Sequence, residues 1–170
     1  MNAEAFWNVI ANYNSATVYL QFGLLLLLIA GCIAARREVT LGYLPKVIYG
    51  AICLYMAVVF FLIYGTEPIQ HFFAFPLFLL LGIAFLYEGI KNKADVFQRL
   101  TVPQWVLIAL VALYPLASVV QGKQFPEMLL YIMPCPVVCM GVILWLGYQK
   151  KNLFSLSLLT LWGLTGIKAF

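Results

Sequence analysis

The stretch ATVYLQFGLLLLLIAGCIAA, residues 16–35, decides the fold of this protein. It contains no charged side chain and runs directly into Arg36 and Arg37. A helix needs about 20 consecutive, largely apolar residues to cross the hydrocarbon core of a bilayer. The stretch therefore predicts a transmembrane helix that ends at a basic connection.

The rest of the chain has the same character. Of its 170 residues, 65% are hydrophobic and only 9% are charged, whereas a soluble domain carries roughly 25% charged residues. The mean hydropathy is +0.99. Because a soluble fold could not bury so much apolar surface, we predict an all-α integral membrane protein that forms a single domain over residues 1–170.

Five further apolar stretches follow the first. The predicted spans are residues 16–35, 44–64, 70–90, 103–121, 126–148 and 153–169. Residues 3–13 alternate apolar and polar side chains, which fits either a helix lying on the membrane surface or an extension of the first span. Since no Lys or Arg precedes the first span, we expect no cleavable signal peptide.

The charge distribution predicts the orientation of this six-helix bundle. Eight of the ten basic residues lie around the first, third and fifth connections: Arg36, Arg37, Lys46, Lys91, Lys93, Arg99, Lys150 and Lys151. The positive-inside rule places these connections in the cytoplasm and both termini outside. The net charge of +4 then reflects topology and attraction to anionic lipid, and indicates no nucleic-acid partner.

Prolines interrupt the predicted third, fourth and fifth spans. Within a helix, proline removes one backbone hydrogen bond and kinks the chain, and in lipid the freed carbonyl needs a new partner. The four candidate kinks are Pro76, Pro115, Pro134 and Pro136. All lie in the predicted outer half of the bilayer, so they indicate either an outward-facing cavity or simply a shaped bundle. The candidate lining residues are Gln21, His71, Tyr114 and Cys135.

The stretch MPCPVVCM, residues 133–140, suggests a second kind of site. Cys135 and Cys139 are four residues apart and would share one face of a regular helix, with Met133 nearby. Thiolate and thioether ligands favour Cu(I). However, Pro136 disturbs the intervening turn and the spacing is not that of a C-x-x-C redox pair, so a closely packed helix is the alternative.

Glu88 is the remaining candidate. It lies near the inner end of the third predicted span, and carboxylates within a membrane are energetically costly and usually functional. A salt bridge with Lys91 or Arg37 close to the headgroups is the alternative. No hydrolase, zinc-protease, nucleotide or dinucleotide signature is present. An enzyme is therefore the least supported class, and we expect no cofactor.

Several short motifs occur in a characteristic order: Tyr13-Asn14, an aromatic third span, Tyr114-Pro115, Pro134-Cys135-Pro136, and Trp162 with Gly166. Together they resemble a family of small bacterial six-span membrane proteins known only as a domain of unknown function. The resemblance covers nearly the whole chain, and the Pro-Cys-Pro triplet is its most specific element. Val137 and Val138 stand where that family has hydroxyl residues. The resemblance implies a bacterial inner-membrane location and no assigned activity.

These observations leave three classes of function open. The first is a small channel or transporter with a cavity at the proline-rich outer halves of spans three to five. The second is a soft-metal or thiol-handling protein, and the third is a non-catalytic scaffold or partner subunit. A monomer of 170 residues leaves little room for a conduit, so a homodimer is one expected arrangement. The sequence names no substrate or ion.

Overall fold

A computed structural model of the protein describes residues 3–93 and 95–166. Apart from one isolated β-bridge between Phe97 and Tyr148, the regular structure within these ranges is helical. Its α-helices are α1 (Ala3–Arg37), α2 (Leu44–Tyr55), α3 (Phe75–Lys91), α4 (Val102–Leu113), α5 (Leu116–Val120), α6 (Pro134–Gly147) and α7 (Leu153–Gly166). The predicted end of the last span, near residue 169, lies outside the described residues.

Three helical segments are long and apolar enough to cross a membrane: Glu4–Arg37, Val39–Ile63 and Gln70–Lys91. In the second, α2 continues into the π-helical segment Met56–Ile63, and in the third a π-helical turn, Gln70–Ala74, leads into α3. The apolar helices α4, α6 and α7 are shorter. The described chain is thus helical, and its three long apolar segments are compatible with a membrane protein.

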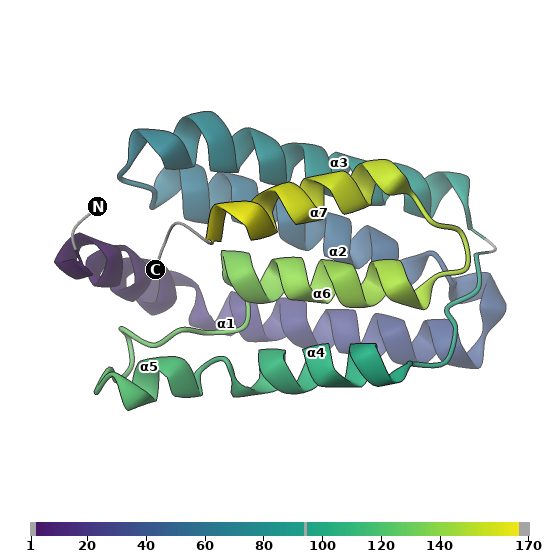
Figure 1. Ribbon diagram of the computed structural model, residues 1–170, viewed down its shortest axis with the longest axis horizontal. Coiled ribbons are helices and arrows are strands. Elements are labelled where there is room, and N and C mark those ends of the chain that lie inside the picture. Colours follow the sequence, from purple (N-terminus) through teal and green to yellow (C-terminus); the bar gives the residue numbers. More distant parts are fainter. Residues whose placement is uncertain (1–2, 94, 167–170) are drawn as a thin grey trace.

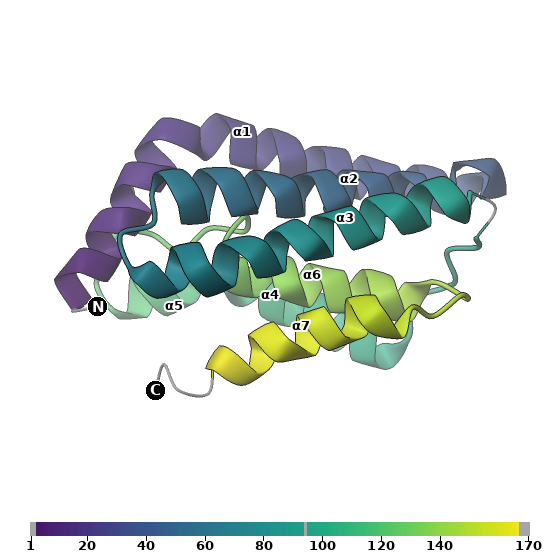
Figure 2. The same ribbon diagram turned by 90° about the horizontal axis from the view of Figure 1, so that it is seen from above.

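The helices run roughly along one axis of the molecule (Figures 1 and 2). The connections α1–α2, α3–α4 and α6–α7 gather at one end, which we call the basic end (Figure 1). Its exposed cationic side chains are Arg36, Arg37, Lys91, Lys93, Arg99, Lys150 and Lys151. Lys46, which the sequence analysis counted with them, is 1% exposed and belongs to the interior.

Residues 3–13 are continuous with the first span, because α1 begins at Ala3 and the described residues contain no separate surface helix before it. Figure 2 shows that the first turns of α1 run at an angle to the rest of the helix. Thr17 donates a hydrogen bond to the Tyr13 carbonyl four residues earlier, at 2.6 Å. Such back-bonding from a hydroxyl side chain often bends helices.

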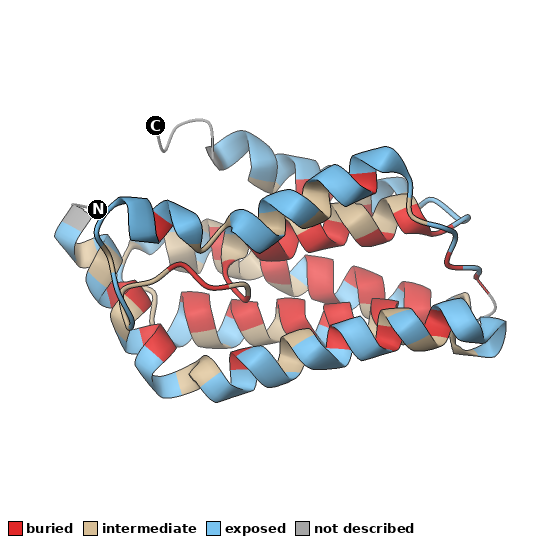
Figure 3. Ribbon diagram, turned by 90° about the horizontal axis from the view of Figure 1, so that it is seen from below, coloured by how far each residue is buried: buried red, intermediate tan, exposed pale blue. Residues whose placement is uncertain are grey.

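Helices α2 and α3 pack closely against each other, and along the bundle buried residues face inward and exposed residues face outward (Figure 3). Two glycines allow the backbones to approach closely. A Cβ added at Gly82 would lie 2.9 Å from the Gly50 carbonyl oxygen. Beside this contact, the ring of Tyr49, next to Gly50, packs edge to face against the ring of Phe85, with the ring centroids 4.6 Å apart.

Helix α6 begins only at Pro134, eight residues after the predicted start of the fifth span near residue 126. Proline is tolerated in the first turn of a helix, where amides have no partner within the helix. The chain before it is held by side chains of α1 instead. Asn14 donates to the carbonyls of Pro126 and Met128 at 2.8 and 2.7 Å, and Tyr13 donates to the carbonyl of Ile132 at 2.9 Å.

Three of the four prolines lie at helix ends, whereas Pro76 lies inside the continuous helical segment Gln70–Lys91. Pro134 and Pro136 lie in the first turn of α6, so they start this helix and do not kink it, contrary to the prediction. Pro115 lies at the break between α4 and α5. Pro76 is at the start of α3, where the preceding π-helical turn joins the α-helix. The fourth predicted span is thus two short helices.

Candidate functional site

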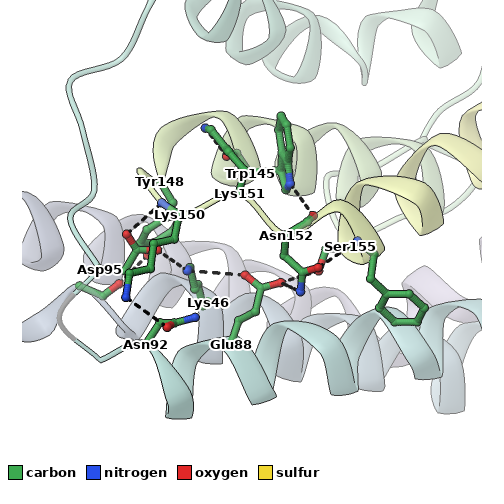
Figure 4. A network of polar contacts seen from close by, with 12 residues as sticks. Lys46, Glu88, Asn92, Asp95, Trp145, Tyr148, Lys150, Lys151, Asn152 and Ser155 are labelled. Atoms are coloured by element: carbon green, nitrogen blue, oxygen red, sulfur yellow. Dashed lines mark hydrogen bonds and ion pairs between the residues drawn. The ribbon is translucent and has the colours of Figure 1, made fainter.

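Buried charges gather just inside the basic end (Figure 4). Lys46, in the first turn of α2, points its ammonium group between two carboxylates. The Lys46 Nζ atom lies 2.7 Å from Asp95 Oδ2 and 3.6 Å from Glu88 Oε2. The three side chains are at most 8% exposed. We call Lys46, Glu88 and Asp95 the ion cluster.

Glu88, on α3, is the member with the most side-chain partners. Both Asn152 Nδ2 and Ser155 Oγ donate hydrogen bonds to its Oε1 atom at 2.6 Å. These donors come from the α6–α7 connection and from α7. The predicted partners Lys91 and Arg37 are wrong: the cation nearest to Glu88 is Lys46, which the fold carries inward from the first connection.

Asp95 comes from the α3–α4 connection and is 3% exposed. Besides the ion pair with Lys46, it accepts a hydrogen bond from the backbone amide of Lys150 at 3.2 Å. The Tyr148 ring covers Lys46, with Nζ 4.1 Å from the ring centroid. The Tyr148 hydroxyl donates to the Gly42 carbonyl at 2.6 Å. The ion cluster therefore joins the connections of the basic end to one another.

The electrostatics of this cluster are unusual for a simple structural contact. With each group in its ordinary charge state, one cation faces two carboxylates, and the buried charge is −1. Taking charges out of water is costly, and their mutual attraction compensates only with good geometry and further hydrogen bonds. Here the Ser155 hydroxyl, the Asn152 amide and the Lys150 backbone amide supply those bonds.

The predicted cavity-lining residues are distributed over α1, the π-helical turn before α3, the α4–α5 break and α6. Gln21 lines a cavity of about 10 Å³ together with Phe22, Leu25, Leu130, Tyr131 and Ile132, and the other three candidates are not in this lining. Tyr114 lies against the Cys135 thiol, as does Trp162. His71 lies in the π-helical turn before α3 and is partly exposed.

The candidate metal ligands are placed as follows. Cys135 is exposed and Cys139 is partly buried on α6. Met133 is buried, and its sulfur accepts a hydrogen bond from the Leu130 amide at 3.4 Å. Across the described residues, His, Cys, Asp and Glu side chains form no group of three or more that could hold a metal ion. No observation in the described chain therefore favours the soft-metal interpretation.

Sequence reasoning missed two of the three charges in the ion cluster. Lys46 follows Pro45 at the start of an apolar run, and it was counted as a topology signal. Asp95 is the single acidic residue in the otherwise basic stretch KNKADVFQR, residues 91–99. An isolated acid among like-charged lysines and arginines is the signal that could have marked it for an internal ion pair.

Comparison with known proteins places the chain in a family without assigning it a role. No curated protein and no solved structure gives a significant match. A family described as "Family of unknown function (DUF6064)" matches residues 3–170. The resemblance inferred from the sequence to an uncharacterised family is thereby confirmed, and the protein belongs to the family of unknown function DUF6064.

Proposed function

We propose that the protein is a six-span protein of the bacterial inner membrane, with its basic end in the cytoplasm and both termini outside. The concentration of exposed Lys and Arg at one end supports this orientation. The shorter helices do not cross the bilayer by themselves, so each needs further residues to complete a span. α6, with 14 residues, is about 21 Å long. The non-helical residues 128–133, which are buried or partly buried, would lengthen that span because irregular backbone is tolerated in membranes where protein covers it.

The topology has a direct test in reporter fusions. Alkaline phosphatase, which is active only outside the cytoplasm, is fused after Lys123 in one fusion and after Lys151 in another. We expect activity only from the fusion at Lys123, because basic connections are retained in the cytoplasm. Green fluorescent protein at the same positions is the control and should give the reverse pattern. Phosphatase activity after Lys151 would contradict the orientation.

Our proposal for activity is proton movement across the membrane, as a channel or as the proton-coupled step of a small transporter. The observation that carries it is the buried ion cluster, in which one lysine faces two carboxylates. Ionisable groups within membrane proteins mark ion pathways and proton relays. We assign the proton-carrying role to Glu88, because it lies in the long apolar segment Gln70–Lys91, whereas Asp95 lies in the α3–α4 connection.

A proton on Glu88 would also weaken the closure of the basic end. Once neutral, Glu88 loses its attraction to Lys46 and becomes a weaker acceptor for Asn152 and Ser155, because hydrogen bonds to an ionised acceptor are roughly twice as strong as neutral ones. Both donors belong to the α6–α7 region. Protonation thus provides a physical route from a charge change to movement of this region against α3.

Proteoliposomes test the proposed activity. Purified protein is reconstituted with a pH-sensitive dye inside, and a pH gradient and membrane potential are imposed. We expect proton entry above that of empty liposomes, and about a tenfold loss in Glu88→Gln, because the amide cannot carry the proton. The matched control is Glu127→Gln, which alters a part-exposed pair with Lys123 and should retain wild-type flux. If wild-type protein adds no flux, the proposal fails and the scaffold class is favoured.

A further inference from the structure

A second polar network lies on α1, and the direction of each of its hydrogen bonds can be deduced. Asn14 Nδ2 donates both hydrogens to backbone carbonyls, those of Pro126 and Met128. Because a carbonyl can only accept, the Asn14 amide cannot be flipped without losing both bonds. Its Oδ1 atom is therefore left as an acceptor, and Gln21 Nε2 donates to it at 3.1 Å.

The neighbouring hydroxyl has a defined direction as well. The single proton of Thr17 Oγ1 goes to the Tyr13 carbonyl, so toward Gln21 this oxygen is an acceptor. Gln21 Nε2 donates to it at 3.0 Å. Both hydrogens of the Gln21 amide are thereby committed, and flipping Gln21 would turn its oxygen toward two acceptors. The Gln21 Oε1 atom must remain on the other side of the amide.

That oxygen is buried and has no hydrogen-bond partner among the described residues. Gln21 is 2% exposed, and it borders the cavity of about 10 Å³ between α1 and residues 130–132. A buried acceptor without a partner is unfavourable, because it has lost its hydrogen bonds to water. A cavity of this size holds about one water, since roughly 10–15 Å³ is required. The other polar side chain in the lining, Tyr131, donates its hydroxyl hydrogen to the Ala112 carbonyl.

From this geometry we infer that Gln21 Oε1 binds a single hydrogen-bond donor of the size of water, either a water molecule or an ammonium ion. The small volume of this partly open cavity matches a donor of about the size of water, and the committed network requires a donor and excludes an acceptor. The ligand would lie between α1 and residues 130–132 of the non-helical chain before α6. This site is separate from the ion cluster and does not depend on proton movement.

The direct test is an experimental structure of the wild-type protein in lipid nanodiscs, at a resolution that shows ordered waters elsewhere in the protein. Two samples are compared, one in sodium chloride and one in ammonium chloride. We expect density about 2.7–3.2 Å from Gln21 Oε1. Gln21→Met, which keeps the length but removes the carbonyl, should lose it. Absence of density in both wild-type samples would overturn the inference, whatever happens to the variant.

Thermal unfolding distinguishes the two donors and needs no variant. If the ligand is ammonium, the melting temperature of the wild-type protein should rise with ammonium chloride and reach a plateau, because a ligand that binds the folded state stabilises it. Sodium chloride and tetramethylammonium chloride are the controls, since neither cation has an N–H donor. Density at Oε1 with no ammonium-specific rise identifies the donor as water.

Discussion

Replacing Lys46 with methionine is expected to destabilise the protein by about 3–5 kcal/mol, the range observed when one partner of a buried ion pair is removed. The methionine keeps the length of the side chain but leaves Glu88 and Asp95 without the cation between them. In addition, the Tyr148 ring loses the ammonium group that lies against it. The measurement is thermal unfolding in detergent, where a fall in melting temperature on the order of 10 °C is expected.

Two comparisons show whether this loss comes from the buried charge. Lys123→Met breaks a part-exposed ion pair with Glu127, and such a pair contributes only about 0–1 kcal/mol. The double variant Lys46→Met with Asp95→Asn should recover part of the lost stability, because it removes one of the two uncompensated carboxylates. Equal shifts for Lys46→Met and Lys123→Met would show that the ion cluster is not the stabilising element inferred here.

Gly82→Ala is expected to lower the free energy of unfolding by about 1–3 kcal/mol, the usual effect of overpacking a close contact. The added Cβ would lie 2.9 Å from the Gly50 carbonyl oxygen and 2.7 Å from Leu54 Cδ2. The Leu54 side chain can rotate away, but the carbonyl belongs to the backbone of a helix. Relief therefore requires α2 and α3 to move apart, and thermal unfolding of the purified variant measures the loss.

Gly23→Ala provides the matched control. Gly23 also lies within a long helix, α1, but a Cβ there would have no atom within 4 Å. Because alanine is favoured over glycine in a helix interior by roughly 0.5–1 kcal/mol, this variant should be as stable as the wild type or slightly more so. A loss of stability in Gly23→Ala as large as that in Gly82→Ala would mean that helix packing is not the cause.

These predictions separate two kinds of residue that looked alike in the sequence. Gly23 and Gly82 both lie within apolar runs. Only at Gly82 would an added Cβ meet the backbone of a neighbouring helix, at Gly50. Similarly, Lys46 and Lys91 both flank predicted spans, yet one is buried and the other is exposed. Local sequence describes the residue and its immediate neighbours, whereas these roles depend on contacts between helices.

Composition and hydropathy were enough to predict the helical character, the long apolar segments and the clustering of basic connections, because these follow from the transfer of side chains into lipid, residue by residue. Residues 126–133 do not follow from composition and hydropathy. Their apolar character predicted a helix, but carbonyls in this segment bond to Asn14 and Tyr13 of α1, more than a hundred positions earlier in the chain. Side-chain donors from another helix replaced the hydrogen bonds of a helical turn.

The same distinction applies to the candidate sites. The sequence by itself determined that the protein consists of apolar helices with basic connections at one end. It also marked Glu88 and Gln21 as polar groups at membrane depth. Only the tertiary structure decided their partners. Lys46 comes from another helix and lies between Glu88 and Asp95. The carbonyls of Pro126 and Met128 fix the Asn14 amide, whose oxygen accepts a hydrogen bond from Gln21. Ion pairs and hydrogen bonds act over a few ångströms in space, so their partners are set by how helices pack and not by their order in the sequence.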